Sequence, residues 1–165
     1  MSRLGVISDS HIPERASEFP ESFRERISTA DQVLHAGDFT SGEVLAEVES
    51  LADGHLTAVY GNMDPWNLDL PAVDTLAIEG VSFVVAHGTG APDDYEERVA
   101  KIVREEAGED AIGIAGHTHQ VLDTTREGIR LLNPGSVTGA APASRATMMT
   151  IDVDDGNLDV MVHEA

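Results

Sequence analysis

The sequence predicts an α/β layered domain, and three observations carry that prediction. In the N-terminal half, short apolar runs typical of buried strands alternate with segments whose apolar residues recur at helical spacing. In the C-terminal half, most segments read as strands separated by turn residues. The 165 residues contain no internal repeat, low-complexity segment or linker, so we expect a single domain over residues 1–165.

The N-terminal half predicts three strands and two helices. Each strand is a short apolar run that ends in polar residues, as a buried strand does where it meets a loop. Each helix presents apolar residues to one face. Thr40, with Glu43 three residues later, is a capping-box signal for the second helix. In chain order the elements are the strand 4–7, a helix with Phe19, Phe23 and Ile27 on one face, the strand 33–34, a helix with Val44, Leu45, Val48 and Leu51 on one face, and the strand 56–60.

The C-terminal half predicts a hairpin, one helix and five further strands. Glu79-Gly80 is the expected turn of a hairpin between 75–78 and 81–86. Pro92 opens a helix whose acidic first turn suits its positive end, and Gly108 is the expected stop. The remaining strands are 112–115, 120–125, 129–132, 146–153 and 157–163, with a turn at 154–157 joining the last two.

Composition limits the chemistry and the partners. Cysteine is absent, which excludes disulfides, thiolate metal sites and a cysteine nucleophile. Ten basic and thirty acidic residues give a net charge of −20, which opposes binding to long nucleic acid and to anionic membranes. We find no signal-peptide pattern and no apolar run near the ~18–20 residues that span a bilayer, so we expect a cytoplasmic protein. The acids are scattered and Lys101 is the only lysine, which favours a halophilic source over an ordinary acidic protein.

Polar motifs follow five of the expected strands. Because ligands of α/β proteins bind beyond the carboxyl ends of the strands, we expect these side chains to gather at one edge. Each motif alone is weak, since Asp, Asn and Gly are ordinary turn residues, but their order and common placement give them weight. The candidate metal ligands are Asp9, His11, Asp38, Asn62, His87, His117 and His119, whereas His35, His55 and His163 are expected to be structural or surface residues.

Two carboxylates, one amide and four imidazoles suit two divalent ions better than one, because seven ligands exceed what one ordinary site uses. Asp38 is a candidate bridge between ions ~3.5–4 Å apart, and a water shared by the two ions supplies hydroxide near neutral pH. The residues of each Asp-x-His or His-x-His pair project to the same side if the backbone is extended. Glycines precede three of the candidates and permit close approach of the backbone.

In this order the motifs resemble those of the calcineurin-like metallophosphoesterases, over residues 3–163. The run Asn133-Pro134-Gly135-Ser136 and the short length point to the small single-domain phosphodiesterase branch. The resemblance implies a four-layer αββα sandwich with a dinuclear metal site at the strand C-terminal edge. It implies two divalent ions, most often Mn²⁺, with Ni²⁺, Fe²⁺ or Zn²⁺ as alternatives. By motif, the first metal is held by Asp9, His11, Asp38 and His119, and the second by the bridging Asp38 with Asn62, His87 and His117.

The resemblance also implies hydrolysis of a small phosphodiester by attack of a hydroxide that bridges the two metals. Many family members carry a histidine directly after the Gly-Asn pair, but Met63 stands there and cannot transfer a proton. Asp64 is therefore a candidate for leaving-group assistance, or for hydrogen bonds that orient the ligands. The alternatives are a phosphomonoesterase or nucleotide pyrophosphatase with the same site, or a non-catalytic scaffold resembling the small retromer subunit. Related small enzymes often self-associate, so a homodimer or homotetramer is a further expectation.

Overall fold

The chain, described over all 165 residues by a computed structural model, forms ten strands in two five-stranded sheets. The first sheet contains, in spatial order, β10 (Asn157–Glu164), β9 (Thr147–Asp154), β1 (Ser2–Ile7), β2 (Gln32–His35) and β3 (Leu56–Ala58). The second sheet contains β4 (Val73–Ile78), β5 (Val81–Ala86), β6 (Ile112–Ile114), β8 (Ile129–Pro134) and β7 (Val121–Arg126).

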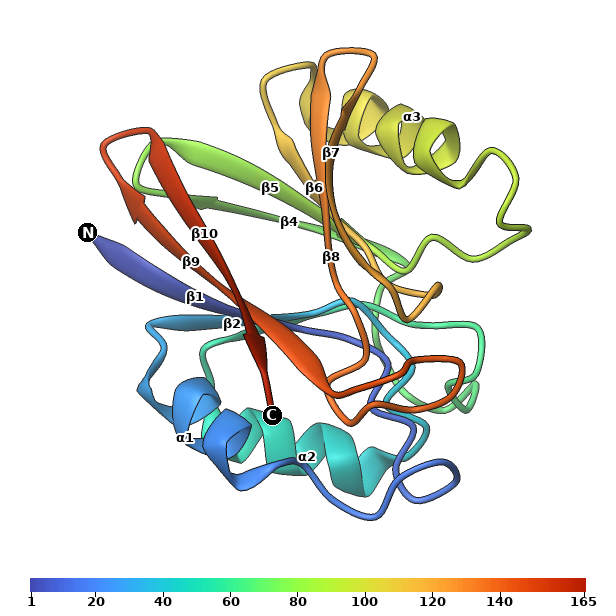
Figure 1. Cartoon of the computed structure of the whole chain (residues 1–165). Helices are drawn as coiled ribbons and strands as arrows, with labels where there is room; N and C mark the ends of the chain where they lie inside the picture. The colour runs from blue at the N-terminus through green and yellow to red at the C-terminus, as the bar shows by residue number, and fades with distance from the viewer.

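Three helices cover the outer faces of the two sheets, so the molecule has four layers (Figure 1). The helices α1 (Glu21–Thr29) and α2 (Gly42–Leu51) lie against the first sheet, and α3 (Tyr95–Ala107) lies against the second. The αββα sandwich expected from the sequence is confirmed. None of the three helices combines the length and the apolar composition that crossing a bilayer requires.

Each of the three interfaces between layers has its own buried core. Phe23 of α1 and Val48 of α2 belong to the core that covers the first sheet. Leu34 and Phe83 belong to the core between the two sheets. Val99 belongs to the core under α3. The helices therefore bury the apolar faces that their sequence spacing predicts, and burial of those faces stabilises the layered arrangement.

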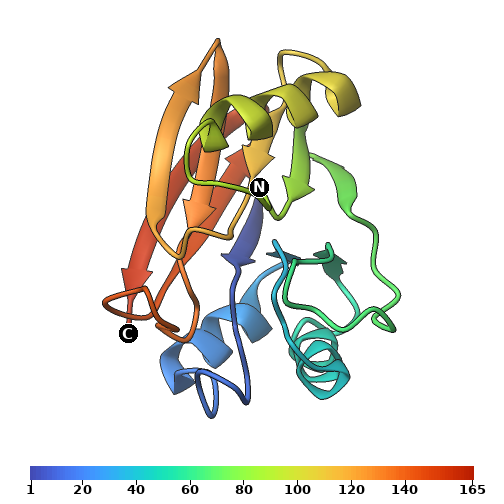
Figure 2. The same cartoon turned by 90° about the vertical axis from the view of Figure 1, so that its right-hand side faces the viewer.

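Parallel pairing brings the polar strand ends to one edge of the molecule. The strands β1, β2 and β3 pair in parallel, and so do β5, β6 and β8. In Figure 2 the arrows of β1 (blue), β5 (green) and β6 (yellow) point the same way. The loops that follow β1, β2, β3, β5 and β6 consequently meet where the two sheets face each other, and these loops carry the candidate ligands.

The start of α2 differs from the sequence prediction. Ser41, not Thr40, caps the helix, because its Oγ accepts a hydrogen bond from the backbone N–H of Val44 at 3.3 Å. Thr40 has a φ of 76°, and its hydroxyl donates to the carbonyl of Ile12 at 2.8 Å. The capping-box interpretation is wrong because this distant carbonyl engages the Thr40 hydroxyl.

Two other boundaries also differ. The helix α3 begins at Tyr95 rather than Pro92, because Asp94 has a φ of 63°, which is outside the helical region. The strand β3 ends at Ala58 rather than Tyr60, whose backbone N–H donates to Pro71 at 2.8 Å instead of to a neighbouring strand. The other expected strands and the hairpins β4–β5 and β9–β10 are confirmed to within two residues at each end.

Candidate metal centre

The carboxylate of Asp38 lies between two groups of side chains. Its Oδ2 is 3.4 Å from Nε2 of His11 on one side and 3.2 Å from Nε2 of His87 on the other. Its Oδ1 accepts a hydrogen bond from the backbone N–H of Met63 at 2.8 Å. Asp38 therefore occupies the central position that a bridging carboxylate requires.

The first group contains Asp9, His11, Asp38 and His119, whose candidate ligand atoms all lie within 4.8 Å of one another. Nε2 of His11 is 3.2 Å from Nε2 of His119, and Nε2 of His119 is 3.5 Å from Oδ1 of Asp9. All four residues are buried. Four nitrogen and oxygen atoms from three different loops thus converge on one point.

The second group adds Asn62, His87 and His117 to the other side of Asp38. Oδ1 of Asn62 is 2.9 Å from Nε2 of His87 and 3.2 Å from Nδ1 of His117. Nδ1 of His117 is 3.3 Å from Nε2 of His87. Asn62 is exposed and His117 is half-buried, so this side of the centre is open to solvent. The structure therefore brings all seven predicted residues together.

Hydrogen bonds to backbone carbonyls orient three of the four imidazoles. Nδ1 of His87 donates to Ala36 at 2.6 Å, and Nδ1 of His119 donates to Ala140 at 2.8 Å. In His117 the two ring nitrogens exchange these roles, and Nε2 donates to the carbonyl of Gly90 at 2.9 Å. These bonds assign the proton to the outer nitrogen and leave a lone pair on the nitrogen that faces the centre, as metal-binding histidines require.

The electrostatics of the centre favour a bound cation. Burial raises the pKa of Asp38, but its close contacts with the imidazoles of His11 and His87 outweigh burial and hold it well below its usual range. Burial raises the pKa of Asp9, whose buried Oδ1 has no hydrogen-bond partner. Burial lowers the pKa of His87, but the Asp38 carboxylate raises it by a larger amount. The net pKa of His87 is therefore above its ordinary value.

A divalent cation fits this environment. It would supply the positive charge that a buried carboxylate such as Asp9 needs in order to stay ionised. It would also separate the pairs of imidazole nitrogens that face each other across each half of the centre. A set of imidazole, carboxylate and amide donors suits Mn²⁺, Fe²⁺, Ni²⁺ or Zn²⁺.

The backbone at the centre differs from the extended conformation that the sequence suggests for the Asp-x-His and His-x-His pairs. Five of the seven candidate ligands have left-handed φ angles, which non-glycine residues rarely adopt. Such strain concentrates at functional sites, where the surrounding fold maintains it. The five angles are 54° for Asp9, 45° for His11, 63° for Asp38, 75° for His117 and 61° for His119.

The carboxylate of Asp64 lies behind the candidate ligands and bonds to backbone groups. Its Oδ2 accepts hydrogen bonds from the N–H groups of Asp38 at 2.9 Å and Gly61 at 2.8 Å. Its Oδ1 accepts from the N–H of Thr40 at 2.8 Å. Both oxygens are engaged in holding two loops together, so the geometry favours the orienting role over leaving-group assistance.

Asn133 is a residue whose importance the sequence did not reveal. It is fully buried, and its Nδ2 donates to the carbonyl of Gly116 and to Oγ1 of Thr118, both at 3.0 Å. These two residues flank His117. Three residues later, Ser136 donates to the carbonyl of Asp9 at 2.7 Å. In the sequence, the run Asn133-Pro134-Gly135-Ser136 pointed only to a branch of the family, because the hydrogen bonds that it makes to distant loops depend on the fold.

His35 has the structural role expected from the sequence and predicts a pH effect on stability. Burial, with repulsion from nearby imidazoles, lowers its pKa from 6.5 to about 3. Its ring accepts from the N–H of Gly37 at 3.0 Å and lies 2.7 Å from Oγ of Ser10. The unfolded chain binds this proton below about pH 6.5 and the folded chain does not until about pH 3. The His35 contribution to stability is therefore complete above pH 6.5 and falls as the pH drops.

We expect His35→Gln to lose stability less steeply than the wild type between pH 6.5 and 4.5. The difference in slope should approach one proton, or ~1.4 kcal/mol per pH unit. Urea unfolding in chelator at several pH values measures it, with the exposed His55 changed to Gln as the matched control. Equal slopes for wild type and His35→Gln would contradict the assignment.

Comparison with known proteins places this geometry in context. Residues 2–156 match the calcineurin-like phosphoesterase superfamily domain. The chain is 36% identical over 160 residues to a probable metallophosphoesterase of Methanothermobacter thermautotrophicus, with 96% of this chain and 90% of that protein covered. It is 26% identical over 152 residues to the phosphodiesterase MJ0936 of Methanocaldococcus jannaschii, with 83% and 85% covered. A solved structure of Vps29 from Chaetomium thermophilum has the same fold, with a TM-score of 0.83, 20% identity, and 100% and 97% covered.

Proposed function

Because the chain belongs to the calcineurin-like phosphoesterase superfamily, we propose that it is a metal-dependent phosphodiesterase that hydrolyses small phosphodiesters. The family read from the order of the sequence motifs is confirmed. Membership in the family, with the buried Asp and His residues, supports a metal-binding phosphoester hydrolase. The preference for diesters over monoesters is a separate step of the proposal, which rests on the side chains around the metal centre.

In this proposal two divalent ions, with Mn²⁺ favoured, occupy the two groups that share Asp38. When bound, two such ions supply a hydroxide nucleophile near neutral pH and positive charge for the phosphate oxygens. Asp9, His11, Asp38 and His119 hold the first ion. Asp38, Asn62, His87 and His117 hold the second.

The other residues of the chain position these ligands. Backbone carbonyls hold three imidazole rings at the nitrogen that faces away from the centre. These carbonyls belong to Ala36, Ala140 and Gly90. Asp64 fixes the backbone that presents Asp38. This preorganisation keeps the donor atoms in place and limits the reorganisation that the reaction needs.

The wall of the hollow at the metal centre is the observation that carries the choice of a diester. This hollow, of about 130 Å³, is lined by Arg15 and Met63 in addition to candidate ligands. Met63 is 43% exposed and has no proton to transfer. A monoester would need a hydrogen-bond donor for a third free oxygen, which the Met63 side chain does not offer. A diester instead presents a carbon-bearing ester group to Met63 and leaves one negative charge for the cations and Arg15.

The proposal is tested with bis(4-nitrophenyl) phosphate and 4-nitrophenyl phosphate. We expect kcat/KM with Mn²⁺ to be at least about tenfold higher for the diester, and activity to vanish in chelator. Assays in low and in molar salt are needed, because the charge of −20 underlies our proposal of a halophilic source. Met63→His places a hydrogen-bond donor for the third free oxygen beside the centre, so it should raise monoester hydrolysis and narrow the difference.

The outcomes separate the alternatives. Faster hydrolysis of the monoester by the wild type would replace the proposal by a phosphomonoesterase. Cation binding without hydrolysis of any phosphoester would instead favour the scaffold role, for which the Vps29 fold is a precedent in shape alone.

A further inference from the structure

The hollow at the metal centre is lined by one arginine, Arg15, and by no lysine. We propose that Arg15 is a catalytic residue: its guanidinium binds a non-bridging oxygen of the substrate phosphate and stabilises the negative charge that grows there in the transition state. The inference rests on the proposed phosphodiesterase function. It adds to that function a side chain that binds the phosphate without binding a metal.

Two hydrogen bonds hold Arg15 beside the candidate ligands. Its backbone N–H donates to the carbonyl of His11 at 2.8 Å. Its Nη1 donates to the carbonyl of Ala141 at 2.9 Å, and the preceding carbonyl, that of Ala140, accepts from His119. Arg15 is thus tied, through its backbone and through its side chain, to the segments that position two members of the first group.

The guanidinium of Arg15 keeps hydrogen-bonding capacity for a ligand. A guanidinium has five N–H donors in one plane, and the bond to Ala141 uses one of them. Arg15 makes no other side-chain hydrogen bond and no ion pair, and it is exposed. The planar set of remaining donors matches the oxygens of a phosphate, which arginine binds through parallel hydrogen bonds.

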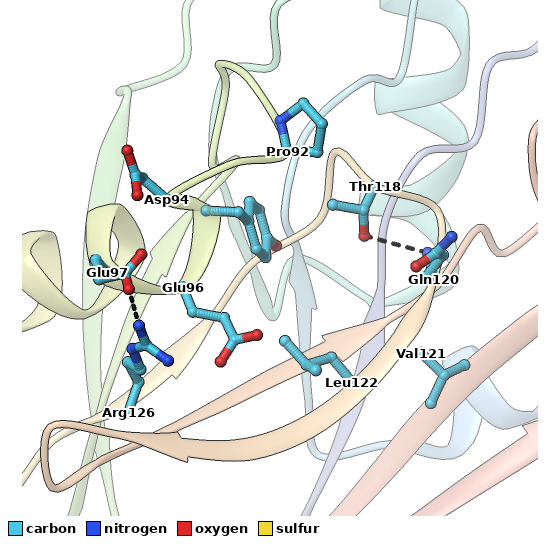
Figure 3. A pocket seen from close by; sticks show the side chains of 10 residues that line it. Pro92, Asp94, Glu96, Glu97, Thr118, Gln120, Val121, Leu122 and Arg126 are labelled. Carbon is cyan, nitrogen blue, oxygen red and sulfur yellow. Dashed lines mark hydrogen bonds and ion pairs between the residues drawn. The ribbon is translucent and has the colours of Figure 1, made fainter.

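The lack of a carboxylate partner is unusual in a protein with thirty acidic residues and ten basic ones. Seven of the ten basic side chains form an ion pair with an Asp or Glu. Arg126, at the hollow beside α3 and β7, pairs with Glu97 (Figure 3). The three arginines without such a pair are Arg15, Arg26 and Arg98, and of these Arg15 alone lines the hollow at the metal centre.

The other residues that line this hollow do not fit the same role. Five of its eight lining residues are candidate metal ligands, and the remaining three are Arg15, Met63 and Pro142. The side chains of Met63 and Pro142 have no hydrogen-bond donor. The backbone N–H of Met63 is already bonded to Asp38. Arg15 is therefore the one side chain outside the ligand set that can donate to a phosphate oxygen in this hollow.

The chemistry of hydrolysis gives such a cation a role. Hydroxide forms a new bond to phosphorus, the bond from phosphorus to one ester oxygen breaks, and the alkoxide that leaves takes a proton from water. Arg15 keeps its own protons, because arginine stays protonated in proteins. The charge on the non-bridging oxygens grows between the bound diester and the transition state, so Arg15 contributes more to kcat than to substrate binding.

Arg15→Gln tests the inference with bis(4-nitrophenyl) phosphate and Mn²⁺. We expect kcat/KM to fall about 10²-fold, the low end of the range for loss of a donor to transition-state charge, because solvent screens an exposed guanidinium. Most of the loss should appear in kcat. Arg26→Gln, the matched control, removes an exposed and unpaired guanidinium from α1 and should keep the wild-type values.

Chemical rescue separates a catalytic role from a structural one. Arg15→Ala leaves space for a free guanidinium ion, and guanidinium chloride at tens of millimolar unfolds little protein. We expect it to raise kcat/KM of Arg15→Ala several-fold over an equal concentration of NaCl. The wild type and Arg26→Ala should show no such increase.

Binding of inorganic phosphate supplies a readout that does not depend on turnover. In calorimetry with Mn²⁺-loaded protein, Arg15→Gln should bind phosphate about tenfold more weakly than the wild type, because one charge-assisted hydrogen bond is lost. Its stoichiometry and affinity for Mn²⁺ should equal those of the wild type, since Arg15 is not a ligand.

The outcomes distinguish this inference from the proposed function. Wild-type kcat and phosphate affinity in Arg15→Gln would overturn the inference and leave the proposed function intact. Weaker Mn²⁺ binding in Arg15→Gln, with no rescue of Arg15→Ala, would also overturn it, because Arg15 would then act only through the ligands. If the wild type bound Mn²⁺ and hydrolysed no phosphoester, while phosphate affinity still depended on Arg15, the proposed function would fail and phosphate binding by Arg15 would stand.

Discussion

Asp38→Asn is expected to lower kcat/KM for a phosphodiester by at least about 10³-fold. Both halves of the centre share Asp38, since its Oδ2 faces His11 and His87 at 3.4 and 3.2 Å. An amide removes the negative charge that would offset repulsion between two cations. In the proposed mechanism the metal centre stabilises the transition state by several kcal/mol, and each 1.36 kcal/mol corresponds to a factor of about ten in rate.

Metal analysis distinguishes this effect from unfolding. The variant should bind less than two equivalents of Mn²⁺ and still unfold in one cooperative transition in chelator, at a lower melting temperature than the wild type, because the folded protein stabilises the ionised Asp38 carboxylate. Asp155→Asn, in the exposed turn between β9 and β10, controls for loss of one surface charge. Full activity of Asp38→Asn in the presence of chelator would reject the metal-dependent mechanism.

Gly61→Ala is expected to disrupt the same carboxylate from behind. A Cβ at this position would lie 2.2 Å from Oδ1 of Asp38 and 2.4 Å from its backbone nitrogen. A packed backbone atom cannot move far enough to relieve so close a contact, so the loops after β2 and β3 must separate. We expect a loss of about 1–3 kcal/mol in the free energy of unfolding, together with weaker Mn²⁺ binding.

Unfolding in urea and titration with Mn²⁺ measure the two effects. Gly116→Ala should behave similarly, because its Cβ would lie 2.0 Å from Oγ of Ser8 and 2.8 Å from Oδ2 of Asp9. Gly42→Ala, at the start of α2, is the control, since its Cβ would make only an ordinary contact of 3.7 Å with Leu68. Wild-type stability and metal affinity in Gly61→Ala would show that close approach of the two loops is not required.

Most of the fold was predictable because hydrophobic periodicity reports burial directly. Phe23 and Ile27 of α1, and Val44 and Val48 of α2, are buried as their spacing predicts. The helix starts were less predictable, because a start depends on single hydrogen bonds. Thr40 looked like a cap, but a carbonyl at Ile12, far away in sequence, engages its hydroxyl.

The set of candidate ligands was also predictable, whereas its geometry was not. Parallel strands leave from the same edge of a sheet, so polar residues after several strands are expected to meet there. No local pattern shows that Asp9 or His119 adopts a left-handed φ. Those angles are maintained by long-range bonds, such as that from Ser136 to the carbonyl of Asp9.

By itself, the sequence determined the layered fold class and the chemistry of the centre. The absence of cysteine leaves nitrogen and oxygen donors, and the motifs after the strands supply seven of them. Only the tertiary structure decided which nitrogen of each imidazole faces inward, that Asp38 lies between two groups, and that Asn133 supports the loop of His117. The physical reason is that composition and periodicity are local properties, whereas these arrangements depend on contacts between residues far apart in the chain.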